Sequence, residues 1–260
     1  MKMPPPPIQL TAVSLALVFG IAATAAGQQA KSGYHYASPE TRAMQDDPFA
    51  NPGTLWLAEG RELWRRAAGR AGKSCASCHG GEASGLKEAI ARYPKFDTIL
   101  GRPLTLSQRI NRCRVENMKA KPLPPESGAI LSLELFLRRQ AAGRPLEVSI
   151  DGPMKPFYEL GKQLYFRRRG QFNLACYQCH DQQPGEYIRG ERLSQGQINN
   201  FPAYLIRWGT IGSAHRRFQL CDGQARAEPF AIGSPQYLAL EVYVASRGRG
   251  LAIEAPAVRP

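Results

Sequence analysis

Two stretches of the sequence carry the same reactive pattern, in which two cysteines stand three positions apart and a histidine directly follows the second. The pattern occurs at 75–79 as Cys-Ala-Ser-Cys-His and at 176–180 as Cys-Tyr-Gln-Cys-His. This is the attachment signature of a c-type haem: the thiols add across the vinyl groups, and the histidine becomes the proximal ligand of the iron. We therefore predict two covalently bound haems c. Their attachment residues are Cys75, Cys78 and His79 for the first haem and Cys176, Cys179 and His180 for the second.

One further cysteine follows each motif, and these two complete the six cysteines of the chain. Cys113 lies 34 positions after His79 (113 − 79), and Cys221 lies 41 positions after His180 (221 − 180). An arginine stands four positions before each of them. One residue type at one place in each repeat suggests one role, a thiolate on the second axial position of each iron. A Cys113–Cys221 disulfide, which an oxidising compartment permits, is the alternative.

Few other side chains could supply the second axial ligand. Methionine is the common choice in c-type cytochromes. Beyond the initial methionines, the candidates are Met44, Met118, Met154, His35 and His215. The two cysteines fit better because the repeat places them equivalently.

An iron-bound thiolate would change what the haem can do. It donates electron density to ferric iron, so it stabilises the oxidised state and lowers the reduction potential. The iron in turn keeps the sulfur deprotonated, and thiolate is the form that attacks other sulfur atoms. Cys221 is the better candidate for such chemistry, because Arg216 and Arg217 precede it and a guanidinium group can hold a small dianion.

The stretch ahead of each haem motif repeats as well. Residues at helical spacing in the first copy return 101 positions later (157 − 56), and the haem motifs keep this displacement. The matching pairs are Trp56 and Phe157, Gly60 and Gly161, Leu63 and Leu164, and Trp64 and Tyr165. The ends of the halves also match, since Leu-Glu-Leu-Phe-Leu at 133–137 resembles Leu-Glu-Val-Tyr-Val at 240–244. These matches indicate an internal duplication, and we expect the aromatic residues to lie in the core.

The repeated helices and the scarcity of alternating strand patterns predict a mainly α fold. We expect two tandem cytochrome c-like domains at 54–150 and 151–260, with a linker between 144 and 153, where Pro and Gly gather. Ahead of them, 27–53 is polar, with scattered Pro and Gly and no steady period. We expect this stretch to be an extended N-terminal arm.

The N-terminus predicts export. Lys2 precedes an apolar run at 10–26 that includes the small residues Ala-Thr-Ala at 23–25, so 1–26 reads as a cleaved signal peptide. An uncleaved anchor is the alternative. No later stretch reaches 18 uninterrupted apolar residues, so we expect no stable membrane insertion. Because c-type haem is attached on the outer side of the bacterial inner membrane, the expected location is the periplasm.

The chain is strongly basic, with 34 Lys and Arg against 21 Asp and Glu and a formal net charge of +13. A basic face can steer a small anion and an acidic protein partner towards the protein. Compensation of the haem propionates is the other explanation. The sequence has no nucleic-acid-binding motif, so we expect no nucleic-acid partner.

The combined motifs resemble the SoxA family, the haem-bearing subunits of the SoxAX cytochromes. The resemblance covers nearly the whole mature chain. Besides both haem motifs, the matching stretches are Ile-Asn-Arg-Cys-Arg at 110–114, Arg-Phe-Gln-Leu-Cys at 217–221, Gln-Ala-Arg-Ala-Glu-Pro at 224–229 and the helix around Leu240 and Glu241. A single Cys-x-x-Cys-His would indicate only a cytochrome, whereas this combination is far more specific.

The resemblance implies an L-cysteine S-thiosulfotransferase. Such a protein joins thiosulfate oxidatively to a cysteine of the SoxYZ carrier protein, forming a cysteine S-thiosulfonate, and passes electrons through haem c to a SoxX-type cytochrome. It implies that Cys221, as a persulfide, is the catalytic residue and distal ligand of the second haem, with His180 as proximal ligand, and that Arg217 binds the substrate. The corresponding ligands of the first haem would be His79 and Cys113. Arg109 occupies the place equivalent to Arg217, so pairing of both arginines with haem propionates is the alternative.

Three other functions remain open from the residues alone. The main competitor is a dihaem electron-transfer cytochrome without its own catalysis, for which Met or His distal ligands are expected. A dihaem peroxidase would need one haem with an open distal site. A related protein that acts on another sulfur anion is the third.

Overall fold

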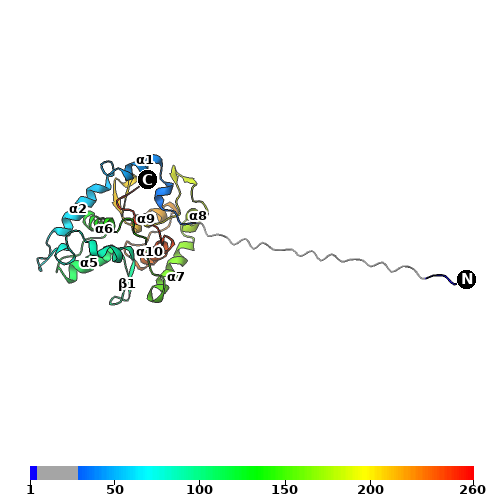
Figure 1. Cartoon of the computed structure of the whole chain (residues 1–260), viewed down its shortest axis with the longest axis horizontal. Coiled ribbons are helices and arrows are strands. Elements are labelled where there is room, and N and C mark those ends of the chain that lie inside the picture. The colour runs from blue at the N-terminus through cyan, green and yellow to red at the C-terminus, as the bar shows by residue number, and fades with distance from the viewer. Residues whose placement is uncertain (5–28) are drawn as a thin grey trace.

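The computed structural model describes residues 1–4 and 29–260 (Figure 1). From residue 5 onwards the predicted signal peptide therefore lies outside the described residues. The described part is mainly helical, as predicted. Its helices are α1 (Pro39–Asp46), α2 (Gly53–Arg65), α3 (Ala76–His79), α4 (Lys87–Ala91), α5 (Leu106–Glu116), α6 (Gly128–Gln140), α7 (Lys155–Phe166), α8 (Cys176–His180), α9 (Ala214–Gln224) and α10 (Pro235–Arg247). The 3-10 turns are η1 (Gly33–Tyr36), η2 (Ser84–Leu86), η3 (Gly152–Met154) and η4 (Ile206–Trp208).

The short strands form three small sheets. They are β1 (Lys95–Asp97), β2 (Arg102–Leu104), β3 (Tyr187–Ile188), β4 (Glu191–Arg192), β5 (Ala203–Leu205), β6 (Thr210–Gly212) and β7 (Ala257–Arg259). Strands β1 and β2 pair antiparallel, as do β3 and β4. The third sheet has the order β6-β5-β7, with β5 antiparallel to β6 and parallel to β7.

Helix α2 packs against α6 at a point where only glycine fits. A Cβ atom on Gly60 would lie 2.0 Å from the carbonyl oxygen of Ser132 and 2.9 Å from Cβ of Phe136. The missing side chain therefore lets the two backbones approach closely. Trp64, 3% exposed, and Phe136, fully buried, belong to the core around this crossing.

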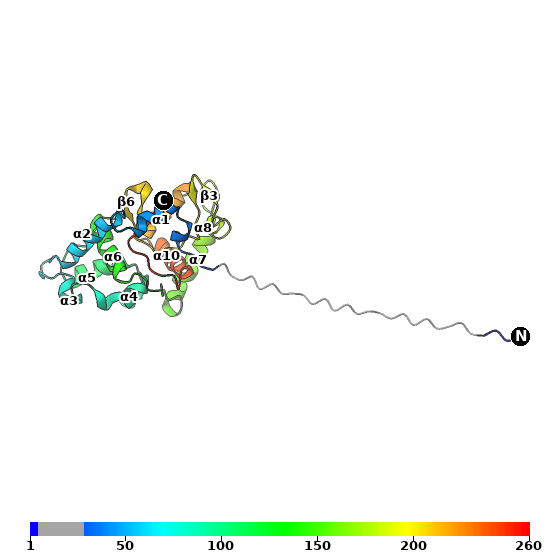
Figure 2. The same cartoon turned by 45° about the horizontal axis from the view of Figure 1, so that its top comes forward.

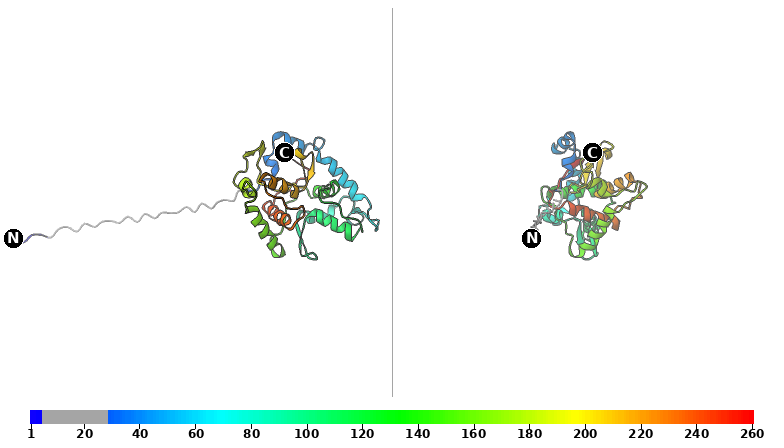
Figure 3. Two further views of the ribbon diagram at one scale, coloured as in Figure 1. Left: turned by 180° about the vertical axis from the view of Figure 1, so that it is seen from behind. Right: turned by 90° about the vertical axis from the view of Figure 1, so that its right-hand side faces the viewer.

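Helices α7 and α10 cross in the same manner. A Cβ atom on Gly161 would lie 2.0 Å from the carbonyl oxygen of Ala239 and 2.8 Å from Cβ of Tyr243. Tyr165 is buried here, as predicted, against Tyr243 at a ring distance of 5.1 Å. In Figure 1, α2 and α7 lie on opposite sides of the molecule, with α9 and α10 between them, and Figure 3 shows the same arrangement from behind.

The helices that carry Cys113 and Cys221 begin at side-chain caps. Thr105 accepts a hydrogen bond from the backbone N–H of Gln108 (3.1 Å), and the Gln108 side chain accepts one from the Thr105 N–H (3.2 Å), which starts α5. Ser213 accepts from the Arg216 N–H (3.2 Å) and starts α9. Each cap satisfies helix N–H groups that have no partner within the helix. The caps fix where α5 and α9 begin, and with it the position of each thiol along its helix.

The expectation of an extended N-terminal arm is wrong for much of its length. The described part of the arm contains η1 and α1, and α1 begins at the cap residue Ser38, which accepts from the Thr41 N–H. The helix was missed because α1 has only eight residues, which is too short to show a helical period in the sequence. Helix α1 packs against β7, and Arg259 Nη1 donates to Gln45 Oε1 (2.6 Å). In Figure 2 the C-terminus accordingly lies beside α1.

The two sequence halves share parts of one core. Ile211 and Ile253, from the second half, are buried in the cluster around α2 and α6. Leu146 and Val148, in the stretch predicted as a linker, are buried against Val242 of α10. Within the described residues, no helix is both long and apolar enough to cross a membrane.

Candidate functional site

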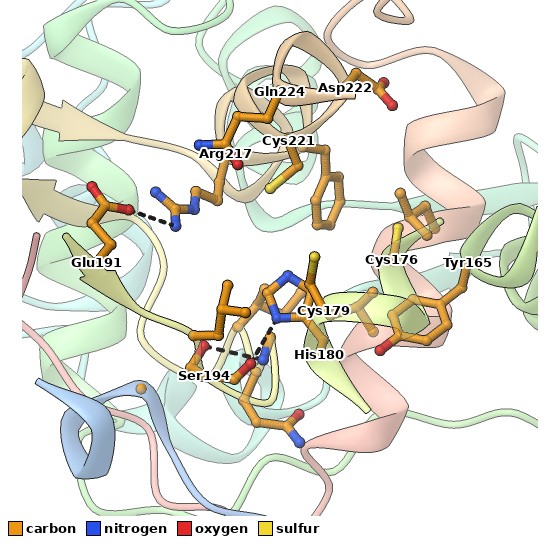
Figure 4. A pocket seen from close by; sticks show the side chains of 18 of the residues that line it. Tyr165, Cys176, Cys179, His180, Glu191, Ser194, Arg217, Cys221, Asp222 and Gln224 are labelled. Carbon is orange, nitrogen blue, oxygen red and sulfur yellow. Dashed lines mark hydrogen bonds and ion pairs between the residues drawn. The ribbon is translucent and has the colours of Figure 1, made fainter. Parts of the chain in front are cut away.

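A cavity in the second half gathers most of the predicted site residues. Its walls include Cys176, Cys179 and His180 from α8 and Arg217 and Cys221 from α9. Figure 4 shows Cys221 and Arg217 on one side of this cavity and His180 on the other. The structure therefore brings together four of the residues predicted for the second haem and the predicted substrate ligand.

The ring of His180 is held from behind by the segment that follows β4. Its Nδ1–H donates to the carbonyl oxygen of Ser194 (2.7 Å). A Cβ atom on Gly196 would lie 2.9 Å from Cγ of His180, and Gly196 has a φ of +73°, which favours glycine. Burial lowers the pKa of His180, so the imidazole is held in its neutral form. Because Nδ1 carries the hydrogen, Nε2 keeps its lone pair for a metal.

Cys221 provides a thiol on the opposite wall. It lies one helical turn after Arg217 on α9 and is partly buried. Burial raises the pKa of the Cys221 thiol, and the charge of Arg217 opposes this rise. A thiol at this place can serve either as a metal ligand or as a sulfur nucleophile.

The two terminal nitrogens of Arg217 differ in their contacts: Nη2 forms a long ion pair, and Nη1 has no partner among the described residues. Its Nη2 lies 3.8 Å from Oε2 of Glu191 on β4, a long ion pair, and Arg207 pairs with the other carboxylate oxygen. The Nη1 atom of Arg217 is buried and has no hydrogen-bond partner among the described residues. A buried guanidinium N–H without a partner is costly and suits an anion.

The residues around the cavity fit a c-type haem. Two thiols stand three positions apart, an imidazole nitrogen is oriented by its backbone hydrogen bond, and a third thiol, that of Cys221, faces it across the cavity. The remaining lining is largely apolar, as a porphyrin ring requires. Its hydrophobic members include Leu164, Ile198, Phe218, Phe230, Leu240 and Val244.

The first motif places the same donors near the surface. Cys78 and His79 are exposed, whereas Cys75 packs partly against the core. Burial raises the pKa of Cys75; the charge of Arg114 opposes this rise, and Cys113 on α5 adds to it. Trp64 donates from Nε1 to the carbonyl oxygen of Gly80 (2.8 Å), directly after His79.

All six cysteines are free in the structure. The alternative of a Cys113–Cys221 disulfide is therefore wrong: both thiols are unpaired, and Cys221 lines the cavity with the haem motif of its own half. Two of the other candidate ligands are engaged elsewhere. His215 is buried with Nε2 2.9 Å from Glu241, and Met154 is buried in the cluster with Leu146 and Val148.

Sequence reasoning missed several residues that shape the site. Ser194 and Gly196 hold the His180 ring, Glu191 faces Arg217, and Arg247 pairs with Asp181. A signal existed for the last pair, because Asp181 and Arg247 differ in type from the residues at the equivalent places of the first half. No signal marked Ser194, whose backbone carbonyl forms the contact.

Comparison with known proteins identifies the family. The family model of the SoxA/TsdA cytochrome c domain matches residues 59–146. The L-cysteine S-thiosulfotransferase subunit SoxA of Pseudaminobacter salicylatoxidans is 43% identical over 229 residues, covering 88% of this chain and 80% of the relative. The chain belongs to the SoxA family. The SoxA subunit of Rhodovulum sulfidophilum is 41% identical over 232 residues, with the same two coverages.

A solved structure agrees with this family. The crystal structure of SoxXA from P. pantotrophus matches with a TM-score of 0.85 and 37% sequence identity, covering 89% of this chain and 87% of that one. The predicted membership of the SoxA family is confirmed, as are the mainly helical, cytochrome c-like fold and covalent binding of haem c.

Proposed function

We propose that this SoxA family member is an L-cysteine S-thiosulfotransferase. It joins thiosulfate oxidatively to the cysteine of a SoxYZ-type carrier protein in the periplasm. Relatives that match 88% of the chain carry this activity in their names. One observation carries the proposal. Cys221 and Arg217, whose Nη1 has no partner among the described residues, lie on the same wall of the cavity and face His180 across it.

The chain holds two haems c in two domains, 54–150 and 151–260, that arose by duplication. Equivalent close contacts support the duplication. A Cβ atom on Gly69 would lie 2.2 Å from the Met118 carbonyl oxygen, and one on Gly170 would lie 2.1 Å from the Ala225 carbonyl oxygen. Cys75 and Cys78 would hold the first haem, with His79 and Cys113 as ligands of its iron. Cys176 and Cys179 would hold the second haem, with His180 and Cys221 as ligands of its iron.

Arg217 binds and orients the substrate. Its free Nη1–H donates to a sulfonate oxygen of thiosulfate, in a charge-assisted hydrogen bond that satisfies the buried donor. This contact directs the outer sulfur of thiosulfate towards Cys221, one helical turn away. Pairing of Arg217 with a haem propionate is the competing assignment.

Cys221 carries the sulfur chemistry. Its thiolate and the outer sulfur of thiosulfate form an S–S bond and lose two electrons. The thiolate of the carrier protein then attacks the thiosulfate sulfur, and Cys221 leaves as a thiolate. Overall, one carrier thiol loses a proton, two electrons depart, and one S–S bond joins the carrier to thiosulfate. Haem c, when bound, supplies the path for these electrons to a SoxX-type cytochrome. Storage of an additional sulfur on Cys221 as a persulfide is a further expectation for the resting protein.

The partner assignments rest on the family. The matching crystal structure is of SoxXA, which supports a heterodimer with a SoxX-type cytochrome. The positive net charge of +13 suits an acidic carrier and a dianionic substrate.

The test compares Cys221→Ala with Cys113→Ala. Each variant, complexed with the cytochrome partner, receives thiosulfate, the carrier thiol and oxidised cytochrome c, and the thiosulfonate on the carrier is measured by mass. We expect Cys221→Ala to lose at least about a thousandfold in turnover, and Cys113→Ala to retain most of it.

Two outcomes would contradict the proposal. If Cys221→Ala keeps its turnover, Cys221 is only a ligand and the sulfur chemistry lies elsewhere. If the parent protein, with both haems attached, forms no adduct, the chain is an electron-transfer cytochrome without this activity.

A further inference from the structure

Arg247, near the end of α10, forms contacts with three separate parts of the second half. Its Nη1 donates to the carbonyl oxygen of Gln195 (3.1 Å), and its Nη2 pairs with Oδ1 of Asp181. Its guanidinium carbon lies 4.5 Å from the ring centre of Tyr165 on α7. Tyr165 also donates from its hydroxyl group to Asp181 (2.7 Å). One planar group thus joins α7, α8 and α10 to the segment after β4.

The groups bound by Arg247 are neighbours in sequence of His180 and of the residues that contact its ring. Asp181 directly follows His180, at the C-terminal end of α8. Gln195 stands between Ser194, whose carbonyl oxygen accepts from His180 Nδ1, and Gly196, which lies against the ring. Arg247 therefore links α8 to the segment 194–196, the two pieces of chain next to the imidazole.

The N-terminal arm holds the same segment from another side. The side chain of Gln195 accepts a hydrogen bond from the Lys31 N–H (2.7 Å) and donates one to the carbonyl oxygen of Gln29 (3.1 Å). Gln195 is 3% exposed, although Gln29 and Lys31 lie at the surface, so these bonds are partly buried. Its backbone carbonyl is left to Arg247, which makes the two attachments independent of each other.

The first half lacks this arrangement. The place equivalent to Arg247 is Gln140 (247 − 107), which donates to the carbonyl oxygen of Phe136 (3.4 Å) within its own helix. The place equivalent to Asp181 is Gly80 (181 − 101), whose carbonyl oxygen accepts from Trp64. A carboxylate and a guanidinium group thus replace two uncharged residues only in the half whose site is enclosed.

We propose that Arg247 is a positioning residue, which sets the orientation of the His180 imidazole by bridging Asp181 and the Gln195 carbonyl group. The inference rests on the proposed function only in that a haem c occupies this cavity. A guanidinium group has a planar fork that donates to both acceptors at once, whereas the ammonium group of lysine is a point donor on a flexible stem. Partners of a ligating histidine commonly tune the metal, and their loss costs about 10- to 100-fold in affinity or activity.

The test uses Arg247→Lys and Arg247→Met in the full chain with both haems, complexed with its cytochrome partner. Low-temperature EPR of the ferric protein reports the ligand field of the second haem, whose signal is assigned with Cys221→Met. Hydrogen exchange reports how firmly 194–196 is held. We expect both variants to shift the g values of this signal and speed exchange at 194–196, with kcat lower by about tenfold.

Two control variants separate positioning from charge. Arg249→Met removes an exposed positive charge two residues away, and Gln140→Met changes the equivalent place of the first half. We expect both to keep the second haem signal of the parent. Asp181→Asn removes the negative charge that Arg247 pairs with, but leaves the Gln195 carbonyl group, so it should shift the signal in the same direction by less. It also serves as the readout if Arg247→Met does not fold.

Particular results would overturn the inference. If Arg247→Lys matches the parent and only Arg247→Met shifts the signal, the positive charge acts at a distance and the fork is unimportant. If none of the Arg247 and Asp181 variants alters the EPR signal, the His180 ring is fixed without Arg247. The spectra do not depend on turnover, so a parent that makes no thiosulfonate would defeat the proposed function and leave this test intact.

Discussion

Each haem motif follows the first helix of a similar pair, α2 with α6 and α7 with α10, but the two motifs are enclosed to different extents. In both halves a glycine, Gly60 or Gly161, lets one helix cross another closely. A Cβ atom added to either glycine would lie 2.0 Å from a carbonyl oxygen. His79 is exposed, whereas the His180 ring lies beneath Ser194 and Gly196. The helical scaffold is thus common to the halves, and the difference lies in what covers the histidine.

The difference in cover lies in the segment of chain that joins the histidine of each motif to the later cysteine of the same half. It spans 41 positions from His180 to Cys221 and 34 from His79 to Cys113. In the second half it includes the β3–β4 hairpin with Glu191 and the segment that covers the proximal ring. The proposed function thus places catalysis in the half whose connection is longer, on a helix pair that both halves share.

The largest expected effect concerns what the halves share. Gly60→Ala and Gly161→Ala would each place a methyl group 2.0 Å from a backbone carbonyl oxygen. We expect either variant to lower the free energy of unfolding by about 3 kcal/mol, measured by urea denaturation, because overpacking forces the helices apart. Gly128→Ala, which meets nothing within 4 Å, is the control and should be neutral. A large loss in only one of the two halves would contradict a common scaffold.

A smaller effect should be confined to the second site. Gly196→Ala would add a methyl group 2.9 Å from the His180 ring, at a φ of +73°. We expect turnover to fall by about tenfold or more, with a changed EPR signal of the second haem only. Gly190→Ala is the matched control, because its φ is +82° and its Cβ would meet nothing within 4 Å. It shares the backbone strain, about 1–2 kcal/mol, but should keep the parent signal. Equal signals from the two variants would show that the covering segment does not position the ring.

The shared features were the ones open to prediction from sequence. The haem motifs, the repeat of Gly60 at Gly161 and the buried Trp64 and Tyr165 follow from residue type and spacing, whereas the close helix crossing at each glycine was not predicted. Helix α1 and the burial of Leu146 were not predicted, because each depends on contacts with distant segments such as β7 and α10. Tertiary packing overrides weak local signals of this kind.

In the second site, only the residues whose side chains have a chemical role could be predicted from the sequence. Cys221 and Arg217 stood out by type and by their place in the repeat, and both line the cavity. The Ser194 contact uses a backbone carbonyl group, which any residue could supply. Glu191 lies 26 positions before Arg217 (217 − 191), and only the fold of the β3–β4 hairpin brings the two together. The sequence therefore did not predict the contacts made by the segment between His180 and Cys221, which distinguish the second half from the first.

The smallest expected effect concerns the ion pair between Arg217 and Glu191. It tests whether Arg217 has a function that its counterpart in the first half, Arg109, does not have. Glu191 lies 3.8 Å from Arg217 and competes with any anion for the guanidinium group. If Arg217 binds thiosulfate, Glu191→Gln should lower KM for thiosulfate by about threefold, because removal of one weakened, partly exposed ion pair is worth less than about 1 kcal/mol. Steady-state turnover at fixed ionic strength measures this. Glu186→Gln, an exposed residue just before the same hairpin, controls for the change in net charge. If KM changes equally in both variants, long-range charge explains it. If KM changes in neither, Arg217 pairs with a propionate in the same way as its counterpart Arg109 is expected to, and the two halves differ less than their connections suggest.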